Sequence, residues 1–508
     1  MYDLVIVGAG PTGLALAQSL AFTDNDLKIL IVDSHDSIGG CHRVERVSSL
    51  TSSLTSSLTR KGLFTEHGPR VYSSSYKTFK KLLKQINLDF DKLFTPYKFT
   101  ISSIGGQTVF RTLSSRELFR LFLEFSKLMF NPNYGSDITM ADFMRNRFSD
   151  RSKELIDRIC RLTDGGGADK FSLNEFLELF NQQMFYSLYQ PRAPNDIGLM
   201  RLWQKALEKT GKVSFLLNSK VQNLEYDKNT NAITSLSINS AQIKADKFVL
   251  AVPPVNIAQI VSSSAPEVQN CFKPIEELRR FANDTNYDVY ISITFHWHAL
   301  LDLPTVYGFP WSEWGIIFIK LTDYMVIDDT KTVMSVAVSL LDRVSSRTGK
   351  TANQSSAQEV IDEVQYQLSE TFNVLAKNQP DYHPPDFSII SPTNYYDGVD
   401  KKWKSTDTAF ISTSQARGLP QTGKINNLYN AGTHNKLSQY RFTTLESAVQ
   451  NGCILADKLY PGVKLKNASI FTIRTALLIL LIILVIFGIY YIVKWKAPQK
   501  RNISKRHT

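Results

Sequence analysis

The sequence predicts a mixed α/β fold that ends in one membrane-spanning helix, and three features point to it. Short apolar runs typical of buried strands, such as Tyr2–Val7 and residues 248–252, alternate with segments of helical periodicity. A glycine-rich turn joins the first strand to the first helix. Residues 475–493 contain no charged side chain. As a helix this segment measures about 28 Å, close to a hydrocarbon core of about 30 Å.

Composition limits the classes of protein that the chain can belong to. With 508 residues, 43% apolar and 21% charged, it is expected to fold into two or three domains and not to be mainly disordered. The net charge is +11, but residues 461–508 hold nine Lys or Arg and no Asp or Glu, which leaves +2 on residues 1–460. A nucleic-acid surface would need basic residues on the folded body, so we expect no nucleic-acid partner.

The cysteines and histidines indicate neither a disulfide framework nor a metal site. Cys41, Cys160, Cys271 and Cys453 are far apart and show no CxxC spacing, which favours a reducing compartment. His296 and His298 could share one face of a strand, but no third ligand accompanies them. We expect no bound metal.

Periodicity predicts the remaining elements in outline. Helices are expected at residues 13–21, 76–86, Ser115–Phe130, 151–163 and 357–375, and further strands at 27–32 and 289–295. Residues 48–59 repeat SSLT three times, which predicts a surface loop or a leucine-lined helical face.

The first strand and the turn after it indicate a Rossmann-like dinucleotide site. The turn reads Gly8-Ala9-Gly10-Pro11-Thr12-Gly13 and opens a helix. Gly8 permits the tight turn, Gly10 lets a pyrophosphate approach, and Gly13 allows close helix packing. Free N–H groups at the helix start, near Pro11 and Thr12, would face the phosphates. A second strand ends at Asp33, whose carboxylate can accept hydrogen bonds from a ribose.

A second glycine pair favours FAD over NAD. Gly39 and Gly40 follow Asp33 closely, so the chain can pass near an extended pyrophosphate. Arg43 could balance the phosphate charge, and Arg46 is an alternative for that role.

With these motifs the sequence resembles the FAD-dependent amine oxidase superfamily, which includes protoporphyrinogen oxidases and carotenoid-type desaturases. Residues 138–171 are similar to the helical part of protoporphyrinogen oxidases, and residues 245–254 to the strand that returns to the substrate domain. The resemblance implies that FAD is contacted by the segments FTEHGPRVY, KVSFLLNSKVQNL and the closing motif at 427–459, through Gly68, Pro69, Arg70, Val221, Gly432, Thr433, Thr444 and Leu445.

The same resemblance implies two interleaved domains. The FAD-binding domain would comprise residues 1–75, 206–270 and 391–460, and the α+β substrate domain residues 76–205 and 271–390. A linker at 461–474, the transmembrane helix at 475–493 and a basic tail at 494–508 would follow.

Several positions depart from the family pattern. Asp33 and His434 stand where the family commonly has Glu and an acidic residue, respectively. Thr444 replaces a tyrosine of the amine cage, unless Tyr440 supplies that wall from elsewhere. No cysteine lies between Cys271 and Cys453, so FAD is expected to bind without a covalent link. The family lysine near flavin N5 could be Lys320, or Lys320 could simply end a strand.

Aromatic residues gather in the substrate half. Trp297, Phe309, Trp311 and Trp314 could line a pocket for a flat or lipid-like substrate or form ordinary core.

Taken with the resemblance, the sequence predicts a membrane-anchored FAD-dependent oxidoreductase. It would move a hydride equivalent from a C–H bond of an amine, porphyrinogen or alkene to flavin, with oxygen as reoxidant. No catalytic residue can be named. The alternative is a non-catalytic binding protein of the Rab escort or GDP-dissociation-inhibitor type, which loss of the second glycine pair or of the closing motif would favour. Both motifs are present.

The expected location follows from the two ends of the chain. Tyr2–Val7 reads as a strand with no leader before it, so we expect a tail anchor with the body in the cytosol. The basic tail carries six Lys or Arg against three on the near upstream flank, and the positive-inside rule taken alone opposes this topology. Similar tails occur in the mitochondrial outer membrane, which is the first expectation.

Overall fold

The computed structural model describes residues 1–23, 26–46, 63–98, 112–164, 166–285, 289–303, 305, 308, 311–327, 330–406, 417–463 and 465–496. The SSLT repeat and Phe309 lie outside this part of the chain.

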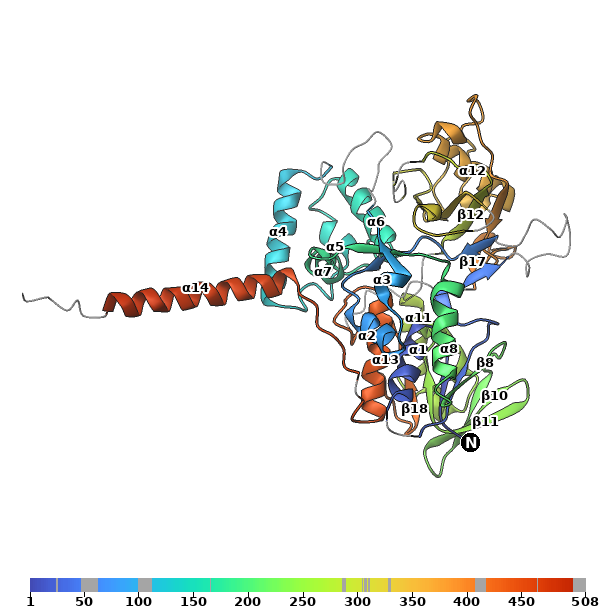
Figure 1. The fold of residues 1–508 in the computed structure, drawn as a ribbon, viewed down its shortest axis with the longest axis vertical. Helices are drawn as coiled ribbons and strands as arrows, with labels where there is room; N and C mark the ends of the chain where they lie inside the picture. Colours follow the sequence, from blue (N-terminus) through green and yellow to red (C-terminus); the bar gives the residue numbers. More distant parts are fainter. Residues whose placement is uncertain are drawn as a thin grey trace, which may run out of the picture.

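A seven-stranded sheet organises the body (Figure 1). Its strands run in the order β8-β2-β1-β11-β10-β9, with β18 also paired to β11. The neighbours β8, β2, β1, β11 and β18 are parallel, and β10 and β9 add an antiparallel extension. The bounds are Tyr2–Val7 (β1), Ile29–Val32 (β2), Val213–Leu216 (β8), Asn223–Asp227 (β9), Ala232–Ile238 (β10), Ala241–Leu250 (β11) and Leu428–Asn430 (β18).

Helices cover both faces of this sheet because its central strands are apolar on both sides. Leu4 and Ile6 of β1 pack with α1 (Pro11–Ala21), α2 (Lys77–Gln85), α8 (Arg201–Glu208) and α13 (Leu445–Leu459). Val5 and Val7 face the other way and pack with α9 (Pro254–Ser262) and α11 (Ile275–Asp284), near the short α10 (Pro266–Gln269).

The two helices α1 and α13 pack closely, although they lie more than 400 residues apart in sequence. A Cβ atom built on Gly452 would lie 2.4 Å from the backbone oxygen of Thr12, so only glycine fits this crossing. The Thr12 hydroxyl donates to the Ala448 carbonyl at 3.0 Å. The closing segment is thereby fastened beside the first glycine turn.

A four-stranded antiparallel sheet, in the order β13-β14-β12-β15, forms the second layer. One face packs on α12 (Ala357–Ser369), and the other carries Ser292, Thr294 and His296 toward β4. His296 Nε2 lies 2.8 Å from the Phe64 carbonyl, which joins this sheet to the β3–β4 strand pair. The bounds are Phe64–Glu66 (β4), Ile291–Trp297 (β12), Ile316–Lys320 (β13), Thr332–Val338 (β14) and Phe387–Ile390 (β15).

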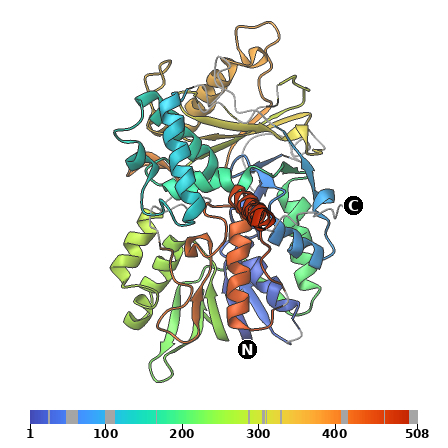
Figure 2. The same cartoon turned by 90° about the vertical axis from the view of Figure 1, so that its left-hand side faces the viewer.

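A group of helices lies beside α14 on the face of the body seen in Figure 2, mostly in its upper part. It contains α3 (Phe90–Leu93), α4 (Ser115–Phe130), α5 (Met140–Met144), α6 (Asp150–Asp164), α7 (Leu173–Gln183) and a π-helical turn at Asp196–Met200. Small sheets connect the layers: β3 (Val44–Arg46) with β4, β5 (Tyr72–Ser73) with β7 (Leu188–Pro191) and β6 (Phe94–Pro96), and β16 (Asn394–Asp397) with β17 (Lys402–Ser405).

The elements match the sequence expectations with shifts at their ends. The predicted bounds of β1 and α4 agree with the structure. The helix expected at residues 357–375 is shorter: α12 ends at Ser369, and a separate 3₁₀ turn follows at Asn373–Leu375. Phe372 and Leu375 both pack into the core cluster around α12, which requires the chain to turn there.

One helix is long and apolar enough to cross a membrane. Within α14 (Ile473–Lys496), Ile473–Ile492 has a mean hydropathy of 2.8, and none of this window is buried by the body. Figure 1 shows α14 projecting away from the body. The helix begins two residues before the predicted span, which started at residue 475. Arg474 is included because its amide is held by the Asn181 side-chain oxygen at 2.9 Å.

The α1–α13 crossing leads to a stability prediction. Gly452→Ala should destabilise the body by about 1–3 kcal/mol, because the added methyl group overlaps a backbone oxygen. The apparent Tm of the purified protein, measured by the loss of its circular dichroism, should fall. Gly398→Ala is the matched control, since a Cβ there meets no atom within 4 Å. Equal Tm values for the two variants would contradict the close crossing.

Candidate functional site

The carboxyl ends of the parallel strands bring the predicted nucleotide residues together. Gly8 follows β1 with φ +110°, and a Cβ there would lie 2.4 Å from the Ala251 oxygen. A Cβ on Gly13 would lie 2.1 Å from the Gly8 oxygen. The turn and its packing therefore require glycine at both positions, whether or not a cofactor is bound. Pro11 and Thr12 begin α1, as expected.

Asp33 lies at the end of β2 and lines a cavity beside this turn. The cavity is lined by Gly8, Asp33, Ser219, Val221, Asn256 and Gln259, among others. One carboxylate oxygen of Asp33 accepts from the Ala9 amide at 2.8 Å, and the other from the His35 amide at 2.9 Å. Burial disfavours the charged form, but the His35 side chain and these amides outweigh it and lower the pKa of Asp33. An ionised acceptor therefore faces the cavity, and Val221 lies there too.

The second glycine pair packs directly on the first glycine turn. The Gly39 amide donates to the Ala9 carbonyl at 2.9 Å. Gly40 has φ +56°, and its Cβ would lie 3.1 Å from the Gly10 Cα. The two turns thus form one backbone surface, whose glycines leave peptide groups accessible to a close ligand.

Both candidate arginines lie near an acidic side chain. Arg46 is engaged by Asp196, with nitrogen–oxygen distances of 2.8 and 2.9 Å. Arg43 is almost fully buried, and its Nε lies 3.9 Å from Glu45. Each arginine thus has an acidic neighbour, and the role of Arg43 in balancing a phosphate charge stays a prediction.

The residues present fit a dinucleotide cofactor. A Cβ on Gly10 would meet only the Gly40 Cα, at 3.8 Å, so one side of this turn is open where a pyrophosphate is expected. Across the sheet edge, the buried Thr433 hydroxyl has no hydrogen-bond partner among the described residues. Such buried polar atoms normally have partners, and a bound cofactor can supply one.

A second cavity lies at Gly68, Pro69 and Arg70, the segment expected near the flavin. Leu162, Tyr290, Ile317 and Ala337 complete its lining together with His67. Apolar and aromatic side chains from α6 and the second sheet thus face the predicted flavin segment.

Sequence reasoning missed the buried charges next to this cavity. Burial raises the pKa of Glu66 to about 7, against the stabilising charge of Arg70. Burial, followed by the charges of Arg70 and His67, lowers the pKa of His42 well below its usual value. The Arg70 guanidinium donates to the Cys41 carbonyl. The signal was the group of ionisable residues inside the otherwise glycine-rich and apolar segment FTEHGPRVY.

The closing motif forms a buried hydrogen-bond network. His434 replaces an acidic residue, and burial lowers its pKa to about 3, so the imidazole is neutral. Its Nε2 lies 3.0 Å from the Asn430 side-chain oxygen, which also accepts from Asn435. The Asn435 side chain accepts in turn from the Gly432 amide at 2.8 Å. A Cβ on Gly432 would lie 2.4 Å from the His434 ring, so His434 itself requires this glycine.

The start of α13 is fixed from two sides. The Thr444 hydroxyl caps the helix by accepting from the Ser447 amide at 3.0 Å, and α13 begins at Leu445. Glu446 is fully buried and accepts from the Thr78 and Phe79 amides at 2.7 and 2.9 Å. Its carboxyl group therefore sits at the N-terminus of α2, where free N–H groups favour an acceptor.

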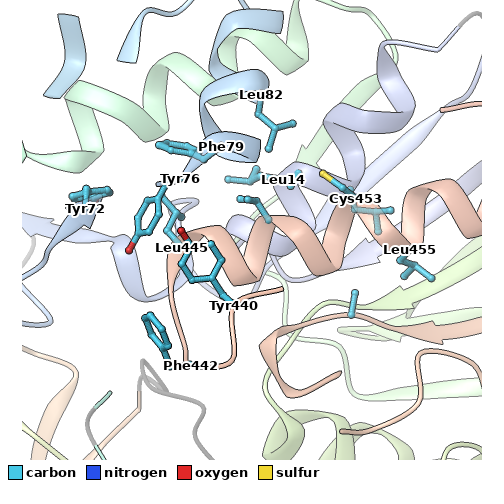
Figure 3. Packing of buried hydrophobic residues seen from close by; sticks show 14 of the residues in the cluster. Leu14, Tyr72, Tyr76, Phe79, Leu82, Tyr440, Phe442, Leu445, Cys453 and Leu455 are labelled. Atoms are coloured by element: carbon cyan, nitrogen blue, oxygen red, sulfur yellow. The ribbon is translucent and has the colours of Figure 1, made fainter. Parts of the chain in front are cut away.

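Aromatic side chains surround this helix start (Figure 3). Tyr440 is buried, and its ring centroid lies 6.1 Å from that of Tyr76 and 5.8 Å from that of Phe442. Tyr440 is thus placed among aromatic rings at the N-terminal end of α13, whereas Thr444 is committed to capping.

Lys320 ends β13 and points away from the second cavity. Its ammonium group lies 2.8 Å from Asp323 and donates to the Leu303 carbonyl. Ile317 lines the cavity from the opposite face of this strand, since neighbouring strand residues alternate. The interpretation of Lys320 as a strand end is confirmed, and its contacts with Asp323 and Leu303 give no support to the alternative role near flavin N5.

The structure also places the tryptophans and His296 of the substrate half. Trp297 and Trp314 are fully buried in the core cluster with α12, so they are core residues and not a pocket lining. Trp311 is half-buried beneath Arg158. Burial lowers the pKa of His296 to about 4, and its ring is bonded to backbone. Across the described part of the chain, no group of three His, Cys, Asp or Glu side chains could hold a metal.

Comparisons with known proteins agree with this geometry. Residues 11–459 match the family model of flavin-containing amine oxidoreductases. No curated protein matches the sequence.

Solved structures share the fold at low sequence identity. A putrescine oxidase bound to putrescine superimposes with a TM-score of 0.62 at 15% identity, and a cyclohexylamine oxidase from Brevibacterium oxydans with 0.58 at 14%. An Exiguobacterium protein assigned as a protoporphyrinogen oxidase gives 0.52 at 16%. Each match covers 90% of this chain and 98% of the other. The chain therefore belongs to the flavin-containing amine oxidoreductases, a family of FAD-dependent enzymes.

Proposed function

We propose that FAD lies along the carboxyl edge of the parallel sheet, where three distant segments meet. Asp33 and Val221 would hold the adenosine end, and Gly432 and Thr433 the middle of the cofactor. The flavin end would lie near the second cavity, beside Leu445. The residues contacting FAD would be Gly8, Gly10, Pro11, Thr12, Gly13, Asp33, Gly39, Gly40, Arg43, Gly68, Pro69, Arg70, Val221, Gly432, Thr433, Thr444 and Leu445. The observation that supports this most strongly is the packing of Gly40 on Gly10 beside the Asp33 cavity.

The two sheets support the interleaved division of the chain. The Rossmann-like FAD-binding domain would comprise residues 1–75, 206–270 and 391–460, which hold every strand of the seven-stranded sheet. The substrate domain would comprise 76–205 and 271–390, which hold α4–α7 and the antiparallel sheet.

The proposed reaction is dehydrogenation of an apolar or aromatic substrate at an amine, porphyrinogen or alkene carbon. Bound FAD supplies the acceptor for a hydride equivalent, and oxygen takes the electrons afterwards. The chain itself supplies a binding surface: Leu162, Tyr290 and Ile317 exclude water and orient the substrate against the Gly68–Arg70 segment. The comparisons give no support to the escort-protein alternative, because the family and its structural neighbours are oxidases.

The enzyme would be anchored through α14. Its apolar window matches the thickness of a bilayer, and Arg474 and Lys494 stand near its ends, where charged groups can reach the headgroups. We propose that the body faces the cytosol and that the mitochondrial outer membrane is the first membrane to examine.

FAD should bind tightly and without a covalent bond. Acid precipitation of the yellow protein should release all of the flavin into the supernatant. Gly10→Val should give folded but colourless protein, because its side chain enters the open space beside Gly40. Gly398→Val should keep the full flavin content. Flavin retained in the pellet would contradict the non-covalent site, and flavin-loaded Gly10→Val protein would contradict the proposed pyrophosphate position.

Small primary amines should be poor substrates, because Thr444 caps α13 and provides no aromatic wall. Peroxide release would be measured with benzylamine, phenethylamine and polyamines at saturating oxygen. Turnover in the ordinary enzymatic range of about 1–10³ per second with any of them would refute this expectation.

The topology can be tested on sealed membranes that contain the full chain. Protease should digest the body and leave a short fragment that includes α14, because only the basic tail is expected across the bilayer. Asn467 begins a glycosylation sequon just before α14 and should carry no glycan. A protected body, or a glycan on Asn467, would reverse the proposed orientation.

A further inference from the structure

The solvent-facing side of α4 is apolar. Phe119 and Phe122 are 60% and 62% exposed, and Phe130 at the helix end is 86% exposed. Leu118 and Leu123 are also exposed. Leu118, Phe119, Phe122 and Leu123 recur every three or four residues and form one stripe, and Phe130 follows on the same side seven residues after Leu123. Isolated exposed apolar residues are ordinary, but a stripe of this kind indicates a surface that is covered by something else.

The opposite side of α4 already has its packing partners. Leu128 is fully buried, and Leu121, Phe125 and Met129 pack against the main core. Ser114 and Glu117 form a capping box that fixes the start of the helix. The exposed stripe is therefore the outer face of a well-anchored helix and not a core face left open by a displaced element.

The stripe lies on the face of the body from which α14 emerges. In Figure 1, α4 stands beside the base of α14, and Figure 2 shows both on the face turned to the viewer. Both helices contact α7. The Arg474 amide is held by Asn181 of α7, and the Phe471 amide donates to the Tyr186 hydroxyl at 2.7 Å.

A second apolar group continues the surface at the foot of α14. Met184 and Phe185 are 63% and 51% exposed, and the Phe185 ring lies 5.4 Å from that of Phe471. We call α4's exposed stripe and these three residues the apolar foot. It consists of Leu118, Phe119, Phe122, Leu123, Phe130, Met184, Phe185 and Phe471.

The charges around the apolar foot suit lipid headgroups. Arg116 and Lys127 are exposed on α4, and Lys466, which is exposed shortly before α14, is paired with Asp457. Neither acidic residue of α4 presents a free negative charge to the surface. Glu117 is buried in the capping box, and Glu124 forms an ion pair with Lys127 at 2.9 Å. An amphipathic helix with aromatic residues on one side and basic residues beside them is typical of the membrane interface.

We propose that the apolar foot lies in the interfacial layer of the same membrane that α14 spans. This rests on the proposed anchoring by α14 and adds a second contact, which fixes the orientation of the body. With α14 alone, the body could rotate about its attachment. With α4 immersed along its length, one face is held against the lipid.

The test uses the full chain in vesicles of phosphatidylcholine and phosphatidylserine. Phe122→Cys is labelled with the environment-sensitive fluorophore NBD, and Leu300→Cys is the matched control. Leu300 is 77% exposed on the loop after β12, on the layer away from α14. Three native cysteines are buried, and unsubstituted protein treated with the same reagent corrects for the fourth. Vesicles with doxyl-labelled lipids then quench any fluorophore that is in the bilayer.

We expect several-fold stronger quenching at position 122 than at position 300, with a blue-shifted emission at 122 only. Equal quenching at both positions, in protein that still floats with the vesicles, would overturn the proposal while leaving the α14 anchor intact. Protein that does not float would refute the anchor itself. A blue shift at 122 that depends on protein concentration and is insensitive to doxyl lipid would identify a second copy of the chain as the occupant and also overturn the proposal.

A double substitution provides an independent readout. Phe119→Ser combined with Phe130→Ser should leave flotation and flavin content unchanged but lower the quenching at position 122, because α4 loses its apolar contact. Val326→Ser and Val399→Ser, both at exposed apolar positions elsewhere, form the control pair. Unchanged quenching in the α4 double variant would show that the stripe does not hold the helix in the membrane.

Discussion

The crossing of α1 and α13 is the contact on which the rest of the structure depends. At this crossing the backbone of Thr12 touches Gly452, and the Thr12 hydroxyl bonds to the Ala448 carbonyl. Because α1 follows the first glycine turn and α13 follows the closing motif, their packing brings both to one edge of the sheet. Asp33 and the second glycine pair reach the same edge through β2. The proposed cofactor site, made from three distant segments, thus needs a single tight helix contact to close it.

A buried carboxyl group extends this arrangement to the proposed flavin end. Glu446 in the first turn of α13 accepts from the first amides of α2, and so holds two helix starts together. The Gln450 side chain, one turn later, also donates to Glu446 at 2.9 Å. Hydrogen bonds of this kind offset the cost of taking a carboxyl group out of water. The aromatic cluster of Tyr76, Tyr440 and Phe442 is positioned by these same helix starts. In this geometry Thr444 caps α13. The chain thus differs at position 444 from amine oxidases that have a tyrosine at the corresponding position.

The sequence predicted those elements whose signal lies in residues close together in the chain. The strand Tyr2–Val7, the glycine turn and α4 follow from apolar spacing and turn residues that lie close together in the chain, and the family resemblance is confirmed. Contacts between distant segments could not be read in this way. Nothing around Lys320 revealed that its ammonium group would donate to the Leu303 carbonyl, and a run of tryptophans reads the same whether it lines a pocket or packs under α12. The buried Glu66 and the neutral His434 have meaning only once their neighbours are known.

The most direct measurement of the central claim is hydrogen–deuterium exchange of the full chain with and without FAD. If one cofactor bridges the segments closed by α1 and α13, FAD should slow exchange together in residues 8–13, 39–43 and 432–445. Residues 357–369 of α12 should show no change, since they pack on the far face of the second sheet. Protection confined to residues 8–13, with unchanged exchange in the closing segment, would contradict the account.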